Sequence, residues 1–239
     1  MQGSTDVLRR RRRDSANQQR THEYSSEAEL SPSSGGPWDI ADDYPEAERI
    51  DCGSLLVPVR EGFEVQINVA EEQGAWVAIV QGENGMQLQA FAAPRGGGLW
   101  DDVRHEIALN ITESGGSSRE SEGPAGIELN GRVPVGDEHG VQEAPQPVRF
   151  LGFDGPRWFL RGVISGPAAT ERAAGDAFYD LFAGVVVVRG DYPAPPRELL
   201  EIRLPEEARQ ALEAQLAEEG QGWGLADPFT RGPEITETR

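Results

Sequence analysis

Residues 63–91, FEVQINVAEEQGAWVAIVQGENGMQLQAF, carry the clearest structural pattern in the chain. Within residues 63–69 and again within residues 86–91, apolar and polar side chains alternate, which is typical of strands with one buried and one wet face. Residues 76–80 form a third, mostly apolar run. The Gly-containing gaps between the three runs have the length of hairpin turns. This part of the chain therefore predicts an antiparallel meander with one solvated face.

The hydrophobic period changes to that of a helix in two later places. From Leu99 onward, apolar residues recur at every fourth position, which predicts an amphipathic helix over residues 100–113. A second helix is predicted over residues 170–183, with Thr170 as its N-cap. Its inward-facing side chains would be Ala174, Phe178, Leu181 and Phe182.

Further strands are predicted both before and after these helices. They cover residues 55–59, 126–135, 147–153, 158–164 and 185–188. The last of them is fully apolar, which is typical of a central strand. Few helices among many strands indicate an α+β fold, with a mainly antiparallel sheet, two packed helices and an additional C-terminal amphipathic helix.

Composition divides the chain into five parts. The opening residues are polar, end in Ser-Pro-Ser-Ser-Gly-Gly and show no periodicity, which indicates disorder. The predicted parts are a disordered Arg-containing tail (1–36), the α+β domain (37–191), a Pro-rich linker (192–204), a C-terminal helix (205–219) and a flexible tail (220–239).

Charge and cysteine content restrict the classes of function. The formal net charge is −19, so the surface repels nucleic acid and anionic membranes, and we expect no specific nucleic-acid partner. The single cysteine, Cys52, fits a reducing compartment. No run of about 18 apolar residues exists to span a membrane, and no apolar region follows Arg9–Arg13 as it would in a signal peptide. We therefore expect a cytoplasmic protein.

The residue types used in catalysis are present without the arrangement that catalysis needs. His105 and Asp101 lie one helical turn apart and could share a cation, but a solvated pair is favoured. Cys52 lies beside an acid, which favours a structural thiol. Residues 95–98, Arg-Gly-Gly-Gly, could cradle an anion before a helix, but acids occupy its first turn, which favours a simple loop. No catalytic residue, metal site or cofactor is predicted.

The strongest candidates for ligand binding are Arg149, Arg157, Phe159 and Arg161. Alternation along one strand places Arg157, Phe159 and Arg161 on the same face. Arg149 lies on the neighbouring strand and completes the predicted cluster. Such a group could hold a carboxylate or phosphate through bidentate hydrogen bonds. The alternative, which the acidic composition favours, is that these arginines pair with acids such as Glu128.

The C-terminal region predicts a protein contact. Leu212 and Leu216 form an apolar stripe on the last helix, and Trp223 follows in the tail. This stripe would dock on the protein's own domain or on an unknown protein partner. The favoured function is therefore a non-catalytic binding or protein-interaction module. The alternative is a small-anion binding domain, or an enzyme, that uses the arginine cluster.

Five segments resemble an actinobacterial family of unknown function that begins with an Arg-rich stretch. They are Gly36-Pro-Trp-Asp39, Met86-Gln-Leu-Gln-Ala-Phe-Ala-Ala-Pro-Arg95, Leu99-Trp-Asp101, Asp154-Gly-Pro-Arg-Trp-Phe-Leu-Arg-Gly162 and Val185-Val-Val-Val-Arg-Gly-Asp191. The resemblance covers roughly residues 36–217 and implies a GC-rich source, which agrees with the complete absence of Lys. It implies no reaction. At the level of fold alone, the order of elements resembles the Mog1/PsbP sandwich.

Overall fold

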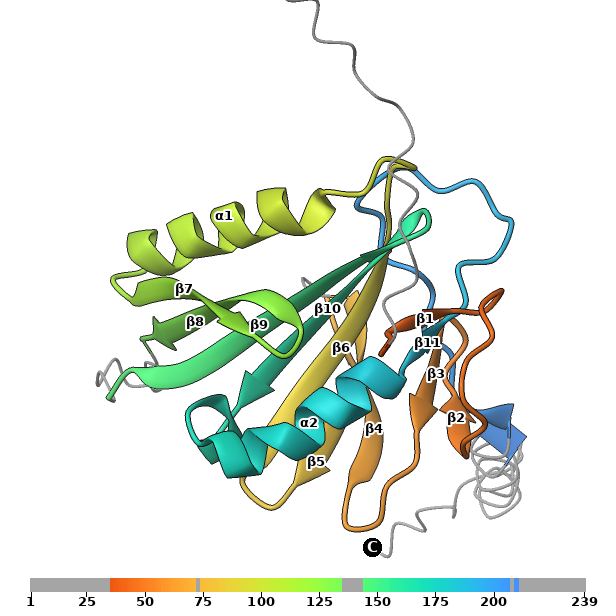
Figure 1. The fold of residues 1–239 in the computed structure, drawn as a ribbon, viewed down its shortest axis with the longest axis horizontal. Coiled ribbons are helices and arrows are strands. Elements are labelled where there is room, and N and C mark those ends of the chain that lie inside the picture. Colours follow the sequence, from red (N-terminus) through yellow and green to blue (C-terminus); the bar gives the residue numbers. More distant parts are fainter. Residues whose placement is uncertain (1–34, 72–73, 135–143, 207–208, 211–239) are drawn as a thin grey trace, which may run out of the picture.

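The computed structural model describes residues 35–71, 74–134, 144–206 and 209–210. A large antiparallel sheet has the strand order β4-β5-β6-β10-β9-β8-β7 (Figure 1). Its strands are β4 (Glu64–Ala70), β5 (Gly74–Gln81), β6 (Asn84–Ala92), β7 (Ser117–Gly123), β8 (Gly126–Val133), β9 (Gln146–Gly155) and β10 (Trp158–Ser165). The predicted meander forms its first three strands.

A small second sheet has the strand order β1-β11-β3-β2. Its strands are β1 (Trp38–Asp39), β2 (Arg49–Asp51), β3 (Leu55–Pro58) and β11 (Val186–Val187). The first and last strands of the domain pair in parallel. The indole nitrogen of Trp158 donates a hydrogen bond of 2.6 Å to Asp39 Oδ2, so this small sheet is also tied to the large one.

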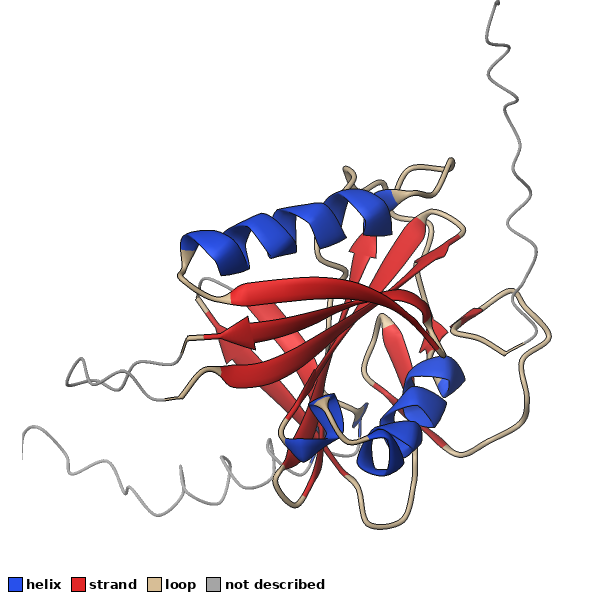
Figure 2. Cartoon of the chain, turned by 60° about the vertical axis from the view of Figure 1, so that its left-hand side comes forward, coloured by secondary structure: helices blue, strands red, loops and turns tan. Residues whose placement is uncertain are grey.

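The two long helices lie on opposite faces of the large sheet. The helix α1 (Leu99–Glu113) contacts β7, β8 and β9, and α2 (Arg172–Gly184), which follows the short helix η1 (Pro167–Ala169), contacts β10 and β3. Phe159 packs with α1, whereas the next residue, Leu160, packs with α2. Since successive side chains of a strand point to opposite faces, the helices flank the sheet, as Figure 2 shows.

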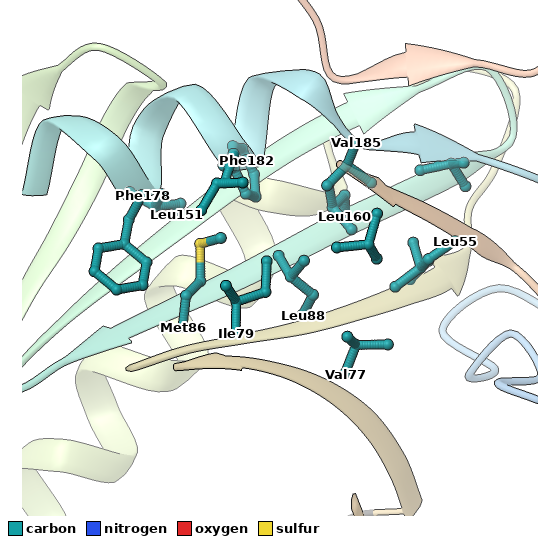
Figure 3. Packing of buried hydrophobic residues seen from close by; sticks show 14 of the residues in the cluster. Leu55, Val77, Ile79, Met86, Leu88, Leu151, Leu160, Phe178, Phe182 and Val185 are labelled. Atoms are coloured by element: carbon teal, nitrogen blue, oxygen red, sulfur yellow. The ribbon is translucent and has the colours of Figure 1, made fainter. Parts of the chain in front are cut away.

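The main core lies between α2 and the large sheet. Phe178 and Phe182 of α2 point toward Met86, Leu88 and Leu160 of the sheet (Figure 3). All five side chains are almost fully buried. Burial of a side chain of this size contributes roughly 1.5–3 kcal/mol, so this layer is the main source of stability.

The smaller core under α1 depends on a close approach between helix and sheet. Trp100 lies directly over Gly152 of β9, where an added Cβ would come within 2.2 Å of the indole ring. Trp100 is buried, stacks on Phe159 with ring centroids 5.9 Å apart, and donates from Nε1 to the Ile127 carbonyl at 2.6 Å. Gly152 is therefore required for the fit of this helix.

The N-terminus of α1 is capped by a residue that lies far away in the sequence. The carboxylate of Asp154 accepts hydrogen bonds from the backbone N–H groups of Leu99, at 3.0 Å, and Trp100, at 3.2 Å. Burial raises the pKa of Asp154, although these hydrogen bonds oppose the shift. The cap fixes the start of α1 on β9.

The structure confirms the predicted α+β class, the mainly antiparallel sheet and the two packed helices, and it corrects several details. The polar edge strand β7 is not predicted, because SSRESEG has no apolar residue to mark a buried face. The predicted N-cap is wrong: α2 is preceded by Glu171, and Thr170 Oγ1 bonds the Pro167 carbonyl. Val69 is 77% exposed, so the inward face of β4 ends before it. The apolar run near residue 186 is central in the small sheet.

The segment predicted as a linker is part of the fold as far as residue 203. Arg197 N–H donates to the Ala92 carbonyl at 2.7 Å, and Leu200 N–H donates to the Ala90 carbonyl at 2.8 Å. Arg203 N–H then bonds the Cys52 carbonyl at 2.9 Å. This segment therefore pairs with the end of β6, beyond the point where the pairing of β5 with β6 stops.

Most of the predicted C-terminal helix lies outside the described residues, together with Leu212, Leu216 and Trp223. The predicted tails 1–36 and 220–239 lie outside them as well, apart from residues 35 and 36. None of the described helices is long and apolar enough to cross a membrane.

Candidate functional site

A polar groove lies between the N-terminal half of α2 and strands β7, β8 and β9. Register places Arg119, Asn130 and Arg149 in one row across the three strands. In the same row, Arg149 pairs with the core residue Ile164 of β10. Paired residues share a face of the sheet, so this row points to the side of α2. Two adjoining hollows of about 530 and 390 Å³ share these three residues. We call this surface the arginine groove, with Arg119, Glu128, Asn130, Arg132, Arg149, Arg172 and Tyr179 as its main residues.

The floor of the arginine groove is a buried carboxylate held by a tyrosine and an arginine. Glu128 is only 1% exposed. The Tyr179 hydroxyl donates to Glu128 Oε2 at 2.6 Å and accepts from Arg149 Nη1 at 2.6 Å. Arg149 Nη1 lies 3.8 Å from Glu128 Oε2, and Arg149 Nε bonds the Ala169 carbonyl at 3.1 Å. The tyrosine therefore bridges two charges that compensate one another.

A glycine leaves room for this carboxylate. A Cβ at Gly123 of β7 would lie 2.1 Å from Glu128 Oε1. The same oxygen accepts a hydrogen bond from Ala125 N–H at 3.4 Å. Both oxygens of Glu128 are thus engaged, and its role is to hold Tyr179 and Arg149 in place.

The Tyr179 hydroxyl resists ionisation. Burial and the hydrogen bond to Glu128 raise the pKa of Tyr179 to about 12, whereas Arg149 acts in the opposite direction. The unfolded chain would ionise near the ordinary value of 10.0. The folded state therefore retains a proton that the unfolded state releases, and this contribution to stability is lost as the pH rises from 10 to 12.

We expect the wild-type protein to lose stability faster than a Tyr179→Phe variant between pH 9 and 11. Above pH 10 the free energy of unfolding of the wild type should fall relative to that of Tyr179→Phe, with a slope that approaches about 1.4 kcal/mol per pH unit. Urea denaturation at several pH values measures it, and Tyr192→Phe, at a position 81% exposed, is the matched control. A constant difference between wild type and Tyr179→Phe across this range would contradict the shifted pKa.

Three arginines at the solvent-exposed border of the arginine groove have no acidic partner among the described residues. Arg119, Arg132 and Arg172 are exposed, and none of them is within 4.0 Å of a carboxylate oxygen among the described residues. Elsewhere, Arg60 pairs with Asp180, and Arg197 pairs with Glu106. Although Glu122 and Asp176 also line the groove, its walls present guanidinium donors toward solvent.

The predicted ligand cluster is divided between the two faces of the sheet. Arg149 lies in the arginine groove, whereas Arg161 pairs with Gly152 and lies with Phe159 beneath α1. Arg157 lies in the turn before β10 with φ of 64°, and its carbonyl accepts from Ala93 N–H at 2.9 Å. The expectation that Arg149 joins Arg161 on one face is therefore wrong. The alternative, pairing with Glu128, is found for Arg149.

The other candidates from the sequence have structural roles. Asp101 pairs with Arg104 at 2.9 Å instead of sharing a cation with His105. The backbone N–H groups after residues 95–98 are taken by the Asp154 carboxylate, so no anion cradle is open there. Burial, with a smaller effect of Asp51, raises the pKa of Cys52 to about 11, which keeps this thiol neutral. Within the described ranges, no three His, Cys, Asp or Glu side chains group as a metal site.

A third hollow, of about 610 Å³, lies beside residues 188–194. Both of its arginines already have partners. Arg189 donates to the carbonyls of Arg157 and Tyr192, and Arg203 bonds Glu201 at 2.6 Å. We therefore regard the arginine groove as the better ligand site.

Comparison with protein-family models identifies a family. A family model described as "Protein of unknown function (DUF3710)" matches residues 36–211. Neither the curated proteins nor the solved structures contain a match to this chain. The resemblance to a family of unknown function is thereby confirmed, whereas the likeness to the Mog1/PsbP sandwich and the actinobacterial source stay predictions.

Proposed function

The chain belongs to this family of proteins of unknown function, and we propose that its domain is a non-catalytic module that binds a small phosphate-bearing ligand in the arginine groove. One observation carries the proposal. Arg119, Arg132 and Arg172 border a single groove, and no carboxylate of the described residues pairs with them. In a chain with a net charge of −19, arginines that face solvent without acids are suited to an anionic ligand.

The chemistry of the groove favours phosphate groups. A guanidinium presents two parallel N–H donors, which match two phosphate oxygens. Ser121 and Asn130 add a hydroxyl and an amide, and they are bonded to one another at 2.7 Å. The combined size of the two hollows fits a ligand with more than one polar group, because small-molecule sites usually occupy about 300–1,000 Å³.

The floor of the groove supports binding more than catalysis. The carboxylate of Glu128 already accepts hydrogen bonds at both oxygens, and the Tyr179 hydroxyl keeps its proton. An arginine whose side chain is held in place by buried neighbours loses less conformational entropy when a ligand binds. Arg149 is such a residue, since Ala169, Tyr179 and Glu128 all contact its guanidinium group.

Thermal-shift and calorimetric titrations with pyrophosphate, nucleotides and phosphosugars test this proposal. A bound ligand at a hundred times its Kd should add about 2.7 kcal/mol to the free energy of unfolding. We expect Arg119→Gln and Arg172→Gln each to weaken binding about tenfold, which is about 1.4 kcal/mol. Arg95→Gln removes the same charge at an exposed site outside the groove, and it should bind like the wild type. No binding across the panel, or equal weakening by Arg95→Gln, would overturn the proposal.

A protein contact through Leu212, Leu216 and Trp223 stays a prediction, because these residues lie outside the described part of the chain. A cytoplasmic location also stays a prediction. Neither is needed for ligand binding in the arginine groove.

A further inference from the structure

A second hollow lies on the opposite face of the sheet, between α1 and strands β6 and β10. Its volume is about 210 Å³. The walls are mainly apolar, and the two phenylalanine rings stack with centroids 6.0 Å apart. We call it the helix pocket, lined principally by Phe91, Leu99, Val103, Ile107, Phe159 and Arg161. It shares no lining residue with the arginine groove.

Arg161 is the one residue of the helix pocket whose charge lacks compensation in the described structure. Its guanidinium carbon lies 5.3 Å from the centre of the Phe91 ring, and Nη2 donates to Gln89 Oε1. No carboxylate of the described chain lies within ion-pair distance of it. Glu106, the acid at the rim of the pocket, is bonded instead to Arg197 at 2.7 Å.

The partly buried and uncompensated charge of Arg161 points to an anionic ligand. Buried charges in proteins are normally paired with an opposite charge. Arg161 is partly buried, so its charge is partly desolvated, and this burial lowers its pKa. Its present partners, a neutral amide and an aromatic face, only partly replace the lost water. An anionic group bound beside Arg161 would supply the missing compensation.

We propose that the helix pocket binds a small carboxylic acid with an apolar body. Its carboxylate would lie on Arg161, and its body would pack against the pocket walls formed by Phe91, Phe159 and Ile107. A dry cavity of roughly 150 Å³ holds one benzene ring, so a volume of about 210 Å³ fits a single ring or a branched chain plus a carboxylate. The apolar walls disfavour a strongly hydrated phosphate. This site is independent of the phosphate site proposed for the arginine groove.

Titration of the full chain with benzoate, and in parallel with its neutral isostere benzamide, tests the proposal. Calorimetry gives the affinity, and ¹H–¹⁵N spectra show which backbone amides respond. We expect benzoate to bind at least tenfold more tightly than benzamide and to shift amides of β6, β10 and α1. Arg161→Gln should weaken benzoate at least tenfold, whereas Arg119→Gln, in the arginine groove, should leave it unchanged.

A second variant tests the same pocket if Arg161→Gln does not fold. Val103→Trp fills the pocket from the partly exposed face of α1, and it should abolish benzoate binding while circular dichroism stays unchanged. Any of four outcomes would overturn the proposal: equal affinity for benzoate and benzamide, full binding of benzoate to Val103→Trp, amide shifts confined to the arginine groove, or no binding at about 10 mM benzoate. That concentration would detect even a Kd in the millimolar range.

Discussion

Replacing Arg149 by Met is expected to lower the free energy of unfolding by about 3–5 kcal/mol, because the buried Glu128 carboxylate would lose the cation that compensates it. Glu128 is 1% exposed, and the Arg149 side chain is 17% exposed. Solvent therefore screens this pair poorly. Met keeps the aliphatic volume of Arg, so the change tests the charge and the hydrogen bonds more than the packing. Urea denaturation measures the loss.

The matched controls separate charge from general damage. Arg60→Met removes an ion pair with Asp180 whose side chains are 43% and 73% exposed, and it should cost less than about 1 kcal/mol. The double variant Glu128→Gln/Arg149→Met removes both charges and should regain at least half of the stability lost in Arg149→Met. An Arg149→Met loss below about 1 kcal/mol, or no recovery in the double variant, would contradict this account of the groove floor.

Replacing Trp158 by Ala should cost about 3–5 kcal/mol, the range seen for buried aromatic residues. Its side chain is fully buried, its ring centroid lies 5.9 Å from that of Phe153, and its indole nitrogen bonds Asp39 in the small sheet. The substitution leaves a large cavity and also removes the link between the two sheets.

A Trp158→Phe variant isolates these two effects. It retains most of the apolar volume and loses the hydrogen bond to Asp39, so its loss should be clearly smaller than that of Trp158→Ala. Denaturation followed by circular dichroism gives both values. Equal losses for the two variants would show that the hydrogen bond dominates, and a Trp158→Ala loss below about 1 kcal/mol would contradict the cavity argument.

The elements predicted well from sequence are those with a strong local pattern. The alternation in β4 and β6 and the helical period of α1 each require one buried face, and neighbouring residues alone reveal that requirement. β7 has no such pattern, because all its side chains are polar or small. Its position is set by pairing with β8, a contact that no local pattern reveals.

The candidate site was harder to predict, because it depends on register. One residue of difference in the pairing of β9 with β10 decides whether Arg149 faces Arg161 or the other side of the sheet. The sequence suggested the first arrangement, and the structure has the second. Glu128 and Tyr179 are 51 positions apart, so only the packing of α2 against the large sheet brings them together. The same holds for Asp154, which caps a helix 55 positions earlier in the sequence.

The attachment of residues 197–203 to β6 also determines where the chain can be shortened. These residues pair with Ala90 and Ala92 at the point where β5 no longer covers β6. A chain that stopped at residue 191, the end of the recognisable core pattern, would expose the backbone N–H and C=O groups of a central strand. Such an open edge readily recruits a strand from another molecule, so the last segment of the domain also protects the protein from self-association.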